Sequence, residues 1–136
     1  YQVFTGLGRF DTSSLPDNAT VTSVKLRLFV TAKTDANNRN LVGEWYDAGS
    51  WPIDAGDWAL TIPTSALPGA DISAIAAGAS NEFTLTNPAS VSLTGLTGLR
   101  LQVDGGAPSG DNYVQIAALE HTSQPEPQLI VTYTTP

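Results

Sequence analysis

Three stretches of this chain alternate apolar and polar residues with a period of two, and no other feature constrains its fold as much. In SVKLRLFVT (residues 23–31), Val24, Leu26, Leu28 and Val30 fall on one face. The same alternation recurs in LRLQVD (99–104) and PQLIVTYT (127–134). A period of two is typical of a strand that is buried on one face only. Because helical periodicity is nearly absent, we expect an all-β protein.

Turn-forming clusters separate these stretches from five shorter strand candidates. The clusters are rich in Pro, Gly, Asn, Asp and Ser, which favour turns; they are SSLPDNAT, KTDANNRN, NPAS, DGGAPSGDN and SQPEP. About eight strands with turns between them predict an antiparallel two-sheet β-sandwich that resembles a jelly roll. At 136 residues, we expect one domain that spans residues 1–136, with at most a short helical turn near residues 71–77.

The charge balance excludes some classes of partner. Six basic residues against thirteen acidic ones give a net charge of -7, which disfavours nucleic acid and anionic membrane surfaces. No apolar run approaches the roughly 20 residues that span a bilayer. Cysteine is absent, so neither disulfides nor thiolate metal sites form. Charged residues make up 14% of the chain, and Thr, Ser, Ala and Gly are abundant. This composition indicates an extracellular or cell-surface β-protein.

The stretch RFDTSSLPDNATVTSVKLRLFV (residues 9–30) resembles the opening motif of the DNRLRE-type domains, a family of extracellular β-sandwiches similar to carbohydrate-binding modules. PQLIVTYT is similar to the family's last strand. The resemblance implies a jelly-roll sandwich, secretion, and a place in multidomain cell-surface or polysaccharide-associated proteins. The matching positions of the opening motif are Arg9, Phe10, Asp11, Thr12, Ser13, Ser14, Leu15, Pro16, Val24, Leu26 and Leu28.

Members of this family usually carry another strand before the Arg-Phe-Asp segment, whereas this chain starts inside YQVFTGLGRF. The resemblance therefore predicts a sandwich that lacks its first strand and has an open apolar groove. A strand from a neighbouring copy, or from an adjacent domain of the same polypeptide, would fill the groove by strand complementation. Repeated between copies, this contact would build a filament. We expect the groove among the apolar residues Val3, Phe4, Leu7, Leu129, Val131 and Tyr133.

An aromatic cluster suggests an alternative function. Trp45, Tyr46 and Trp51 lie close together in a segment that also holds Gly and Asp. Sugar rings stack on aromatic faces, while carboxylates bind their hydroxyl groups, so the cluster predicts a platform for a polysaccharide. The other interpretation is that one or two of these side chains fill the end of the sandwich. Trp58 begins an apolar stretch and is expected in the core.

Oxygen-bearing side chains suggest a metal site. Asp104 and Asp111 flank GGAPSG, and Asp54 and Asp57 form a second pair. Such carboxylates suit Ca²⁺, which takes six to eight oxygen ligands, but solvated acids of a hairpin loop fit the same pattern. Apart from this Ca²⁺ we expect no cofactor. Asn18 begins an N-glycosylation sequon in an exposed turn.

The sequence contains no motif that is typical of a catalytic site. His121 is the only histidine, no Gly-x-Ser-x-Gly elbow occurs, and the Phe-Asp-Thr-Ser-Ser segment is expected to be a turn. We therefore expect a non-catalytic structural module, a repeating subunit of a surface fibre or array, with a carbohydrate-binding module as the alternative.

Overall fold

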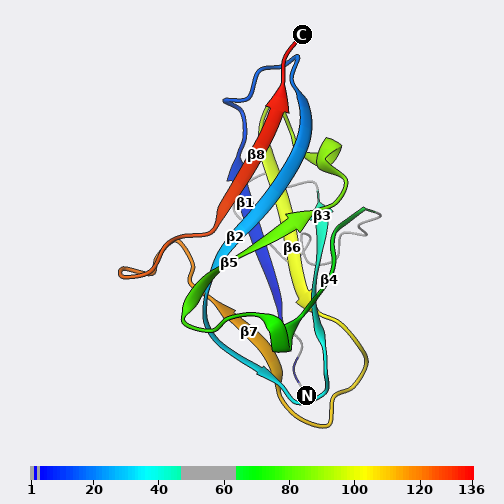
Figure 1. Cartoon of the computed structure of the whole chain (residues 1–136), viewed down its shortest axis with the longest axis vertical. Helices are drawn as coiled ribbons and strands as arrows, with labels where there is room; N and C mark the ends of the chain where they lie inside the picture. Colours follow the sequence, from blue (N-terminus) through cyan, green and yellow to red (C-terminus); the bar gives the residue numbers. More distant parts are fainter. Residues whose placement is uncertain (1, 3, 47–63) are drawn as a thin grey trace.

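The computed structural model describes residues 2, 4–46 and 64–136, which form two antiparallel β-sheets packed face to face (Figure 1). The all-β, two-sheet sandwich expected from the sequence is confirmed. Within these residues, the helical content is limited to two short 3₁₀ turns, η1 (Ile72–Ala74) and η2 (Pro88–Ser90). None of the helices in the described ranges has the length and apolar character to cross a membrane. The strands are β1 (Thr5–Asp11), β2 (Thr20–Asp35), β3 (Asn40–Tyr46), β4 (Ser65–Asp71), β5 (Ala79–Leu85), β6 (Leu96–Val103), β7 (Asn112–Ile116) and β8 (Gln128–Thr134).

The strands divide between the sheets in a crossing pattern. The first sheet, here called the β1 sheet, has the order β1-β6-β3-β4. The second, the β2 sheet, has β5 on one edge of β2 and both β7 and β8 on the other. The two share that edge because β8 pairs with residues 20–27 of β2 and β7 with residues 30–35. The chain therefore passes from one sheet to the other several times, as in a jelly roll.

The core lies between the sheets and centres on β2. The alternating residues Val24, Leu26, Leu28 and Val30 are buried, as the period of two predicts. They belong to one apolar cluster with Leu41 and Trp45 of β3, Leu99 of β6 and Phe83 of β5. This burial decides which face of β2 points inward, and a shift of one residue would expose the whole row.

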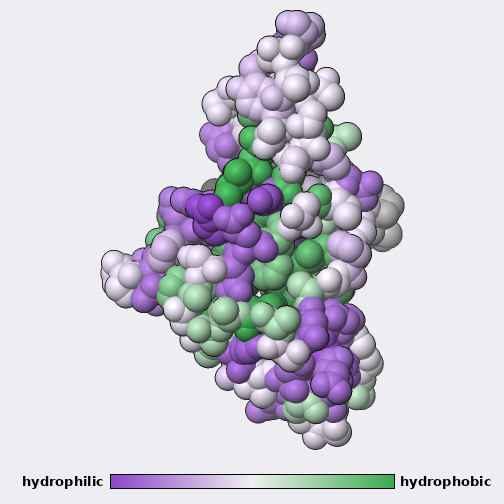
Figure 2. Space-filling model, in the orientation of Figure 1, coloured by the Kyte–Doolittle hydropathy of each residue, from purple (hydrophilic) through white to green (hydrophobic). Residues whose placement is uncertain are grey.

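The outer face of the β2 sheet is polar along its middle. Figure 2 shows a hydrophilic band across this face. Arg27 Nη2 lies 2.6 Å from Glu82 Oε2 on the neighbouring strand, and Lys25 Nζ lies 3.5 Å from Glu82 Oε1. The hydrogen bond from Arg27, followed by its charge, lowers the pKa of Glu82. Because these side chains are exposed, the pairs contribute little to stability, and their main effect is a hydrated sheet face.

The Phe-Asp-Thr-Ser-Ser segment forms a turn, as the sequence suggests. Asp11 Oδ1 accepts a hydrogen bond from the Ser13 backbone N–H at 3.0 Å and another from its hydroxyl at 2.6 Å. Thr12, in contrast, is buried, and its Oγ1 lies 2.7 Å from the Ser92 carbonyl oxygen and 2.8 Å from Thr97 Oγ1. The threonine hydroxyls therefore join the start of the chain to the loop before β6.

A substitution at Gly98 of β6 tests how closely β6 and β3 pack in the β1 sheet. A Cβ atom at this position would lie 2.7 Å from both Tyr46 Cε1 and the Tyr46 carbonyl oxygen. Gly98→Ala should therefore lower the free energy of unfolding by about 1–3 kcal/mol through overpacking, measured by urea denaturation. Gly6→Ala in the same sheet is the control, because its Cβ would lie 3.9 Å from its nearest neighbour. Equal stability of the two variants would contradict this packing.

Candidate functional site

The two sides of the sandwich differ in how they are closed. On one side, Thr86 at the end of β5 donates its backbone N–H to the Ala66 carbonyl of β4 at 2.8 Å. The Thr86 hydroxyl and the Asn87 side-chain amide add bonds to the Ser65 carbonyl at 3.0 and 2.9 Å. On the other side, β1 ends one sheet, while β7 and β8 end the other. We call this second side the open side.

The ladder between β1 and β6 determines which backbone groups reach the open side. Thr12 N–H donates to the Gly95 carbonyl at 3.0 Å, and the register of β1 with β6 continues this pairing. Hydrogen-bonded pairs alternate in an antiparallel ladder, so Gly6 and Gly8 bond to β6. The N–H and C=O groups of Thr5 and Leu7 therefore point away from β6, along the outer edge of β1.

The inward face of β1 carries little side-chain volume. Phe10 packs against the core, so Phe4, Gly6 and Gly8, at the alternate positions, face inward as well. A Cβ atom at Gly6 would have only Leu101 atoms within 4 Å, at 3.9 Å. Gly6 thus leaves a gap in the row of side chains on this side of the sandwich, whereas the Phe10 ring lies 3.4 Å from where a Cβ atom of Gly8 would be.

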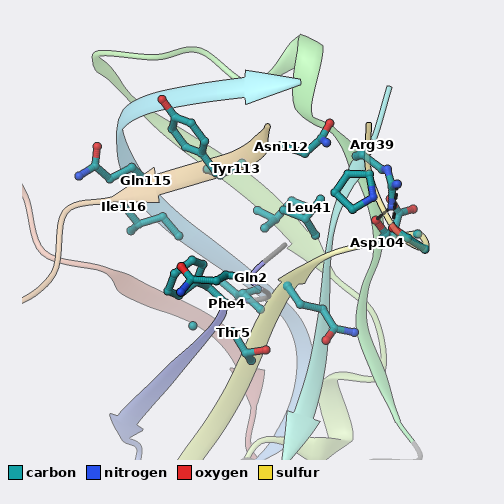
Figure 3. A pocket seen from close by; sticks show the side chains of 18 residues that line it. Gln2, Phe4, Thr5, Arg39, Leu41, Asp104, Asn112, Tyr113, Gln115 and Ile116 are labelled. Carbon is teal, nitrogen blue, oxygen red and sulfur yellow. Dashed lines mark hydrogen bonds between the residues drawn. The ribbon is translucent and has the colours of Figure 1, made fainter. Parts of the chain in front are cut away.

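A cavity of about 500 Å³ occupies this gap. It lies between the start of β1, β6 and β3 on one side and β7 on the other, and Figure 3 shows Phe4, Leu41, Tyr113 and Ile116 around it. Phe4 is 79% exposed, so an aromatic ring lies uncovered at its mouth. Tyr113 is 43% exposed, but it alternates with the core-facing Val114 and Ile116, so its ring lies on the outer face of β7. The apolar part of the lining comprises Phe4, Leu41, Leu101, Val103, Pro108, Tyr113, Val114 and Ile116.

A hydrogen-bonded loop forms the polar rim of the cavity. Asp104 accepts the Asn40 backbone N–H at 2.8 Å and the Asn40 side-chain amide at 2.9 Å. Arg39 donates to the Asp104 carbonyl and, at 2.9 Å, to the Gly106 carbonyl. The bond from the Asn40 backbone, then that from its side chain, lowers the pKa of Asp104, and the charge of Arg39 adds to the effect. Gly105 has φ of +92°, and the Arg39 guanidinium fills the space that a Cβ would take there.

The predicted calcium ligands have other roles in this arrangement. Both carboxylate oxygens of Asp104 accept hydrogen bonds from Asn40, and Asp111 is exposed, with its carbonyl accepting the Ala36 N–H. Within the described ranges, no group of three or more His, Cys, Asp or Glu side chains is placed to hold a metal ion. Asp54 and Asp57 lie outside the described residues.

The predicted groove residues do not lie together. Phe4 lines the cavity, whereas Leu7 lies on the opposite face of β1 by the alternation of the strand. Leu129 and Val131 of β8 pack against the core, and Tyr133 is 41% exposed. Val3 lies outside the described residues. The sequence reasoning missed Gly6, although the repeated glycine in TGLG was a signal for a hollow strand face.

The prediction of an exposed aromatic platform is wrong for Trp45 and Tyr46, two of its three residues. Trp45 is 4% exposed, belongs to the core cluster, and donates its indole N–H to the Thr86 carbonyl at 2.8 Å. Tyr46 is 7% exposed, and its ring covers Gly98. Neither side chain is exposed enough to stack on a sugar, and alternation along β3 places Trp45 on the inward face with Leu41. Trp51 and Trp58 lie outside the described residues.

Two other predicted positions lie at the surface. Asn18 is exposed in the turn that the Ala19 N–H closes onto the Pro16 carbonyl at 2.9 Å. His121 is exposed in the loop between β7 and β8, where its backbone N–H donates to the Ala118 carbonyl.

Comparison of the chain with protein-family models, curated proteins and solved structures found no match. The resemblance of residues 9–30 to the DNRLRE-type domains therefore stays a prediction.

The hydrogen bonds of Asp104 at the rim of the cavity predict that the stability of the protein depends on pH. Because the pKa of folded Asp104 is lowered, its contribution to stability is present above the unfolded value of about 3.9 and is lost as pH falls through the lower folded value. Asp104→Asn leaves one Asn40 donor without an acceptor and removes this titration. Urea denaturation should find the variant less stable near neutral pH, with a smaller loss than the wild type between about pH 5 and pH 2. Parallel pH profiles would contradict the assigned role.

Proposed function

We propose that this chain is a non-catalytic structural module of an extracellular or cell-surface assembly, and that its open side accepts a β-strand from a neighbouring copy. The observation that carries the proposal is an apolar cavity directly beside a strand edge. Backbone groups of Thr5 and Leu7 point to that edge, and Phe4 lies uncovered next to it. An incoming strand uses both features, because its backbone pairs with β1 while its alternate side chains enter the sandwich.

The energetics favour a strand as the occupant. Each new backbone hydrogen bond is worth about 0.5–1.5 kcal/mol net, and apolar surface removed from water contributes about 25 cal/mol per Å². An exposed edge next to apolar surface is the feature that other proteins cover, charge or shorten to avoid association. Here β1 is an edge of seven residues with Gly, Leu and Phe in its sequence. A donor surface other than β1 itself would let repeated contacts extend into a filament instead of closing.

The charged side chains of the described residues support a structural role. Asp11 and Asp71 bind the backbone N–H groups of Ser13 and Ser73. Glu44 pairs with Arg100 across the β1 sheet at 2.6 Å. Where the pKa of a carboxylate is shifted, at Asp11, Asp71, Glu82 and Asp104, it is lowered. A carboxyl group used as a general acid needs the opposite shift.

Blocking the edge of β1 tests this function. Leu7→Pro removes an N–H that points to the open side and leaves the ladder to β6 intact, because proline is tolerated on the outer edge of a sheet. In sedimentation velocity over a concentration series, the wild-type chain should form larger species as its concentration rises. Leu7→Pro should weaken this association about tenfold or more.

Leu7→Ala is the matched control, since it changes the same side chain and keeps the backbone donor. It should associate like the wild type, and circular dichroism should show the same strand content in all three chains. A wild-type chain that stays monomeric throughout the series, or a Leu7→Pro variant that associates like Leu7→Ala, would refute strand acceptance at β1.

A further inference from the structure

Arg39 forms one end of the cavity, and the backbone register explains how it comes to lie there. β3 pairs with β6 as far as Leu41, and the bond from the Asp104 N–H to the Asn40 carbonyl, at 3.0 Å, continues this pairing. The next position along the chain toward the β2–β3 turn places Arg39 opposite Gly105, on the inward side with Leu41. Gly105 makes this possible, because a Cβ atom there would overlap with the Arg39 guanidinium.

The guanidinium of Arg39 has hydrogen-bonding capacity that the described residues do not use. Of its five N–H groups, two donate to backbone carbonyls of the loop that follows β6. This side chain has no further hydrogen bond and no ion pair among the described residues, whereas Arg27 and Arg100 each pair with a glutamate. Both carboxylate oxygens of the nearby Asp104 accept bonds from Asn40 instead. Arg39 therefore brings a positive charge and spare N–H donors to the end of the cavity.

The other polar residues around the cavity direct their side chains elsewhere or use them fully. Side chains that alternate with inward-facing neighbours lie on the outer faces of the sheets. They are those of Thr5, Gln102, Tyr113 and Gln115. The Asn112 amide donates to Asn37 and to the Gly110 carbonyl, and it accepts the Asn37 N–H. Gln2 is exposed before the start of β1.

The walls between Arg39 and the mouth of the cavity are apolar. Figure 3 shows Arg39 at one end, Leu41 in the middle, and Phe4 and Ile116 toward the other end. The inward-facing wall residues are Leu41, Leu101, Val103, Val114 and Ile116. A ligand with an apolar body gains about 25 cal/mol for each Å² removed from water, whereas a polar body would lose its hydration without compensation. The volume of about 500 Å³ lies in the usual range of small-molecule sites.

We propose that this cavity binds a small amphipathic carboxylate. Its carboxylate accepts hydrogen bonds from the Arg39 guanidinium, and its aliphatic or aromatic body packs against the apolar walls. A planar guanidinium matches a carboxylate in geometry as well as in charge. The inference goes beyond the proposed function, because the occupant is a small molecule. Side chains of an incoming strand would enter the same cavity, so binding is tested on the dilute monomer, where no strand competes.

Two probes with the same apolar body separate the effect of charge from that of burial. Octanoate carries the carboxylate, and octanamide replaces it with a neutral amide. In titrations of the wild-type monomer near neutral pH, followed by backbone amide NMR signals, the Kd of octanoate should be about tenfold or more below that of octanamide. The largest shifts should fall on Arg39 and the wall residues. Equal affinity for the two probes, or no binding of octanoate, would overturn the proposal.

Two variants change the charge at the end of the cavity in opposite directions. Asp104→Asn removes a negative charge near Arg39 and keeps the backbone carbonyl to which Arg39 donates, so octanoate should bind about two- to fivefold more tightly. Arg39→Gln should weaken octanoate binding about tenfold and leave octanamide binding nearly unchanged. Octanamide thus reports whether the cavity keeps its shape. If Arg39→Gln does not fold, Asp104→Asn decides, and octanoate binding that is unchanged or weaker in this variant contradicts the role of Arg39.

A variant that fills the cavity tests where the ligand lies. Gly6→Leu adds an apolar side chain to the inward face of β1, where a Cβ atom would lie 3.9 Å from Leu101. This variant should lose binding of both probes, whereas Gly6→Ala, the matched control, should retain it. Wild-type affinity for octanoate in Gly6→Leu would show that the ligand lies elsewhere and would overturn the cavity as its site. These titrations leave strand acceptance to be judged separately, by sedimentation.

Discussion

Burial of the alternating row of β2 against the facing sheet is the interaction on which the other parts of this structure depend. Val24, Leu26, Leu28 and Val30 fix the inward face of a strand that pairs with three others. Because β2 is 16 residues long, it holds β8 and β7 one after the other along a single edge. That arrangement places both strands on the side where β1 ends the other sheet, and no described strand joins the two sheets there.

The open side is a consequence of side-chain volume as well as topology. The opposite side is closed by the bonds of Thr86 and Asn87 to β4. On the open side, Gly6 supplies no side chain, and the exposed ring of Phe4 lies beside the gap. The described residues therefore combine a core centred on β2 with an edge strand, β1, at the margin of the other sheet. Association at the margin therefore need not disturb the core.

The sequence predicts the core better than the site, for physical reasons. Alternation in β2 specifies burial because one face is entirely apolar and the other carries Lys25 and Arg27. In β1, glycines occupy one face, so hydrophobicity alone pointed to Leu7 although the backbone turns it outward. The sequence left Trp45 open between a sugar platform and a side chain that fills the end of the sandwich, and in the structure Trp45 lies in the core on the same face as Leu41. The contact of Asp104 with Asn40 joins residues far apart in the chain, which no local pattern reveals.

Residue-resolved amide hydrogen exchange, compared between dilute monomer and concentrated assembly, tests the central claim most directly. The Leu7 N–H points to the open side, whereas the Gly8 N–H bonds to β6 in either state. The account predicts that exchange at Thr5 and Leu7 slows on assembly while exchange at Gly8 changes little. Unchanged exchange at Leu7, or new protection at Val114 on the edge of β7 instead, would contradict it.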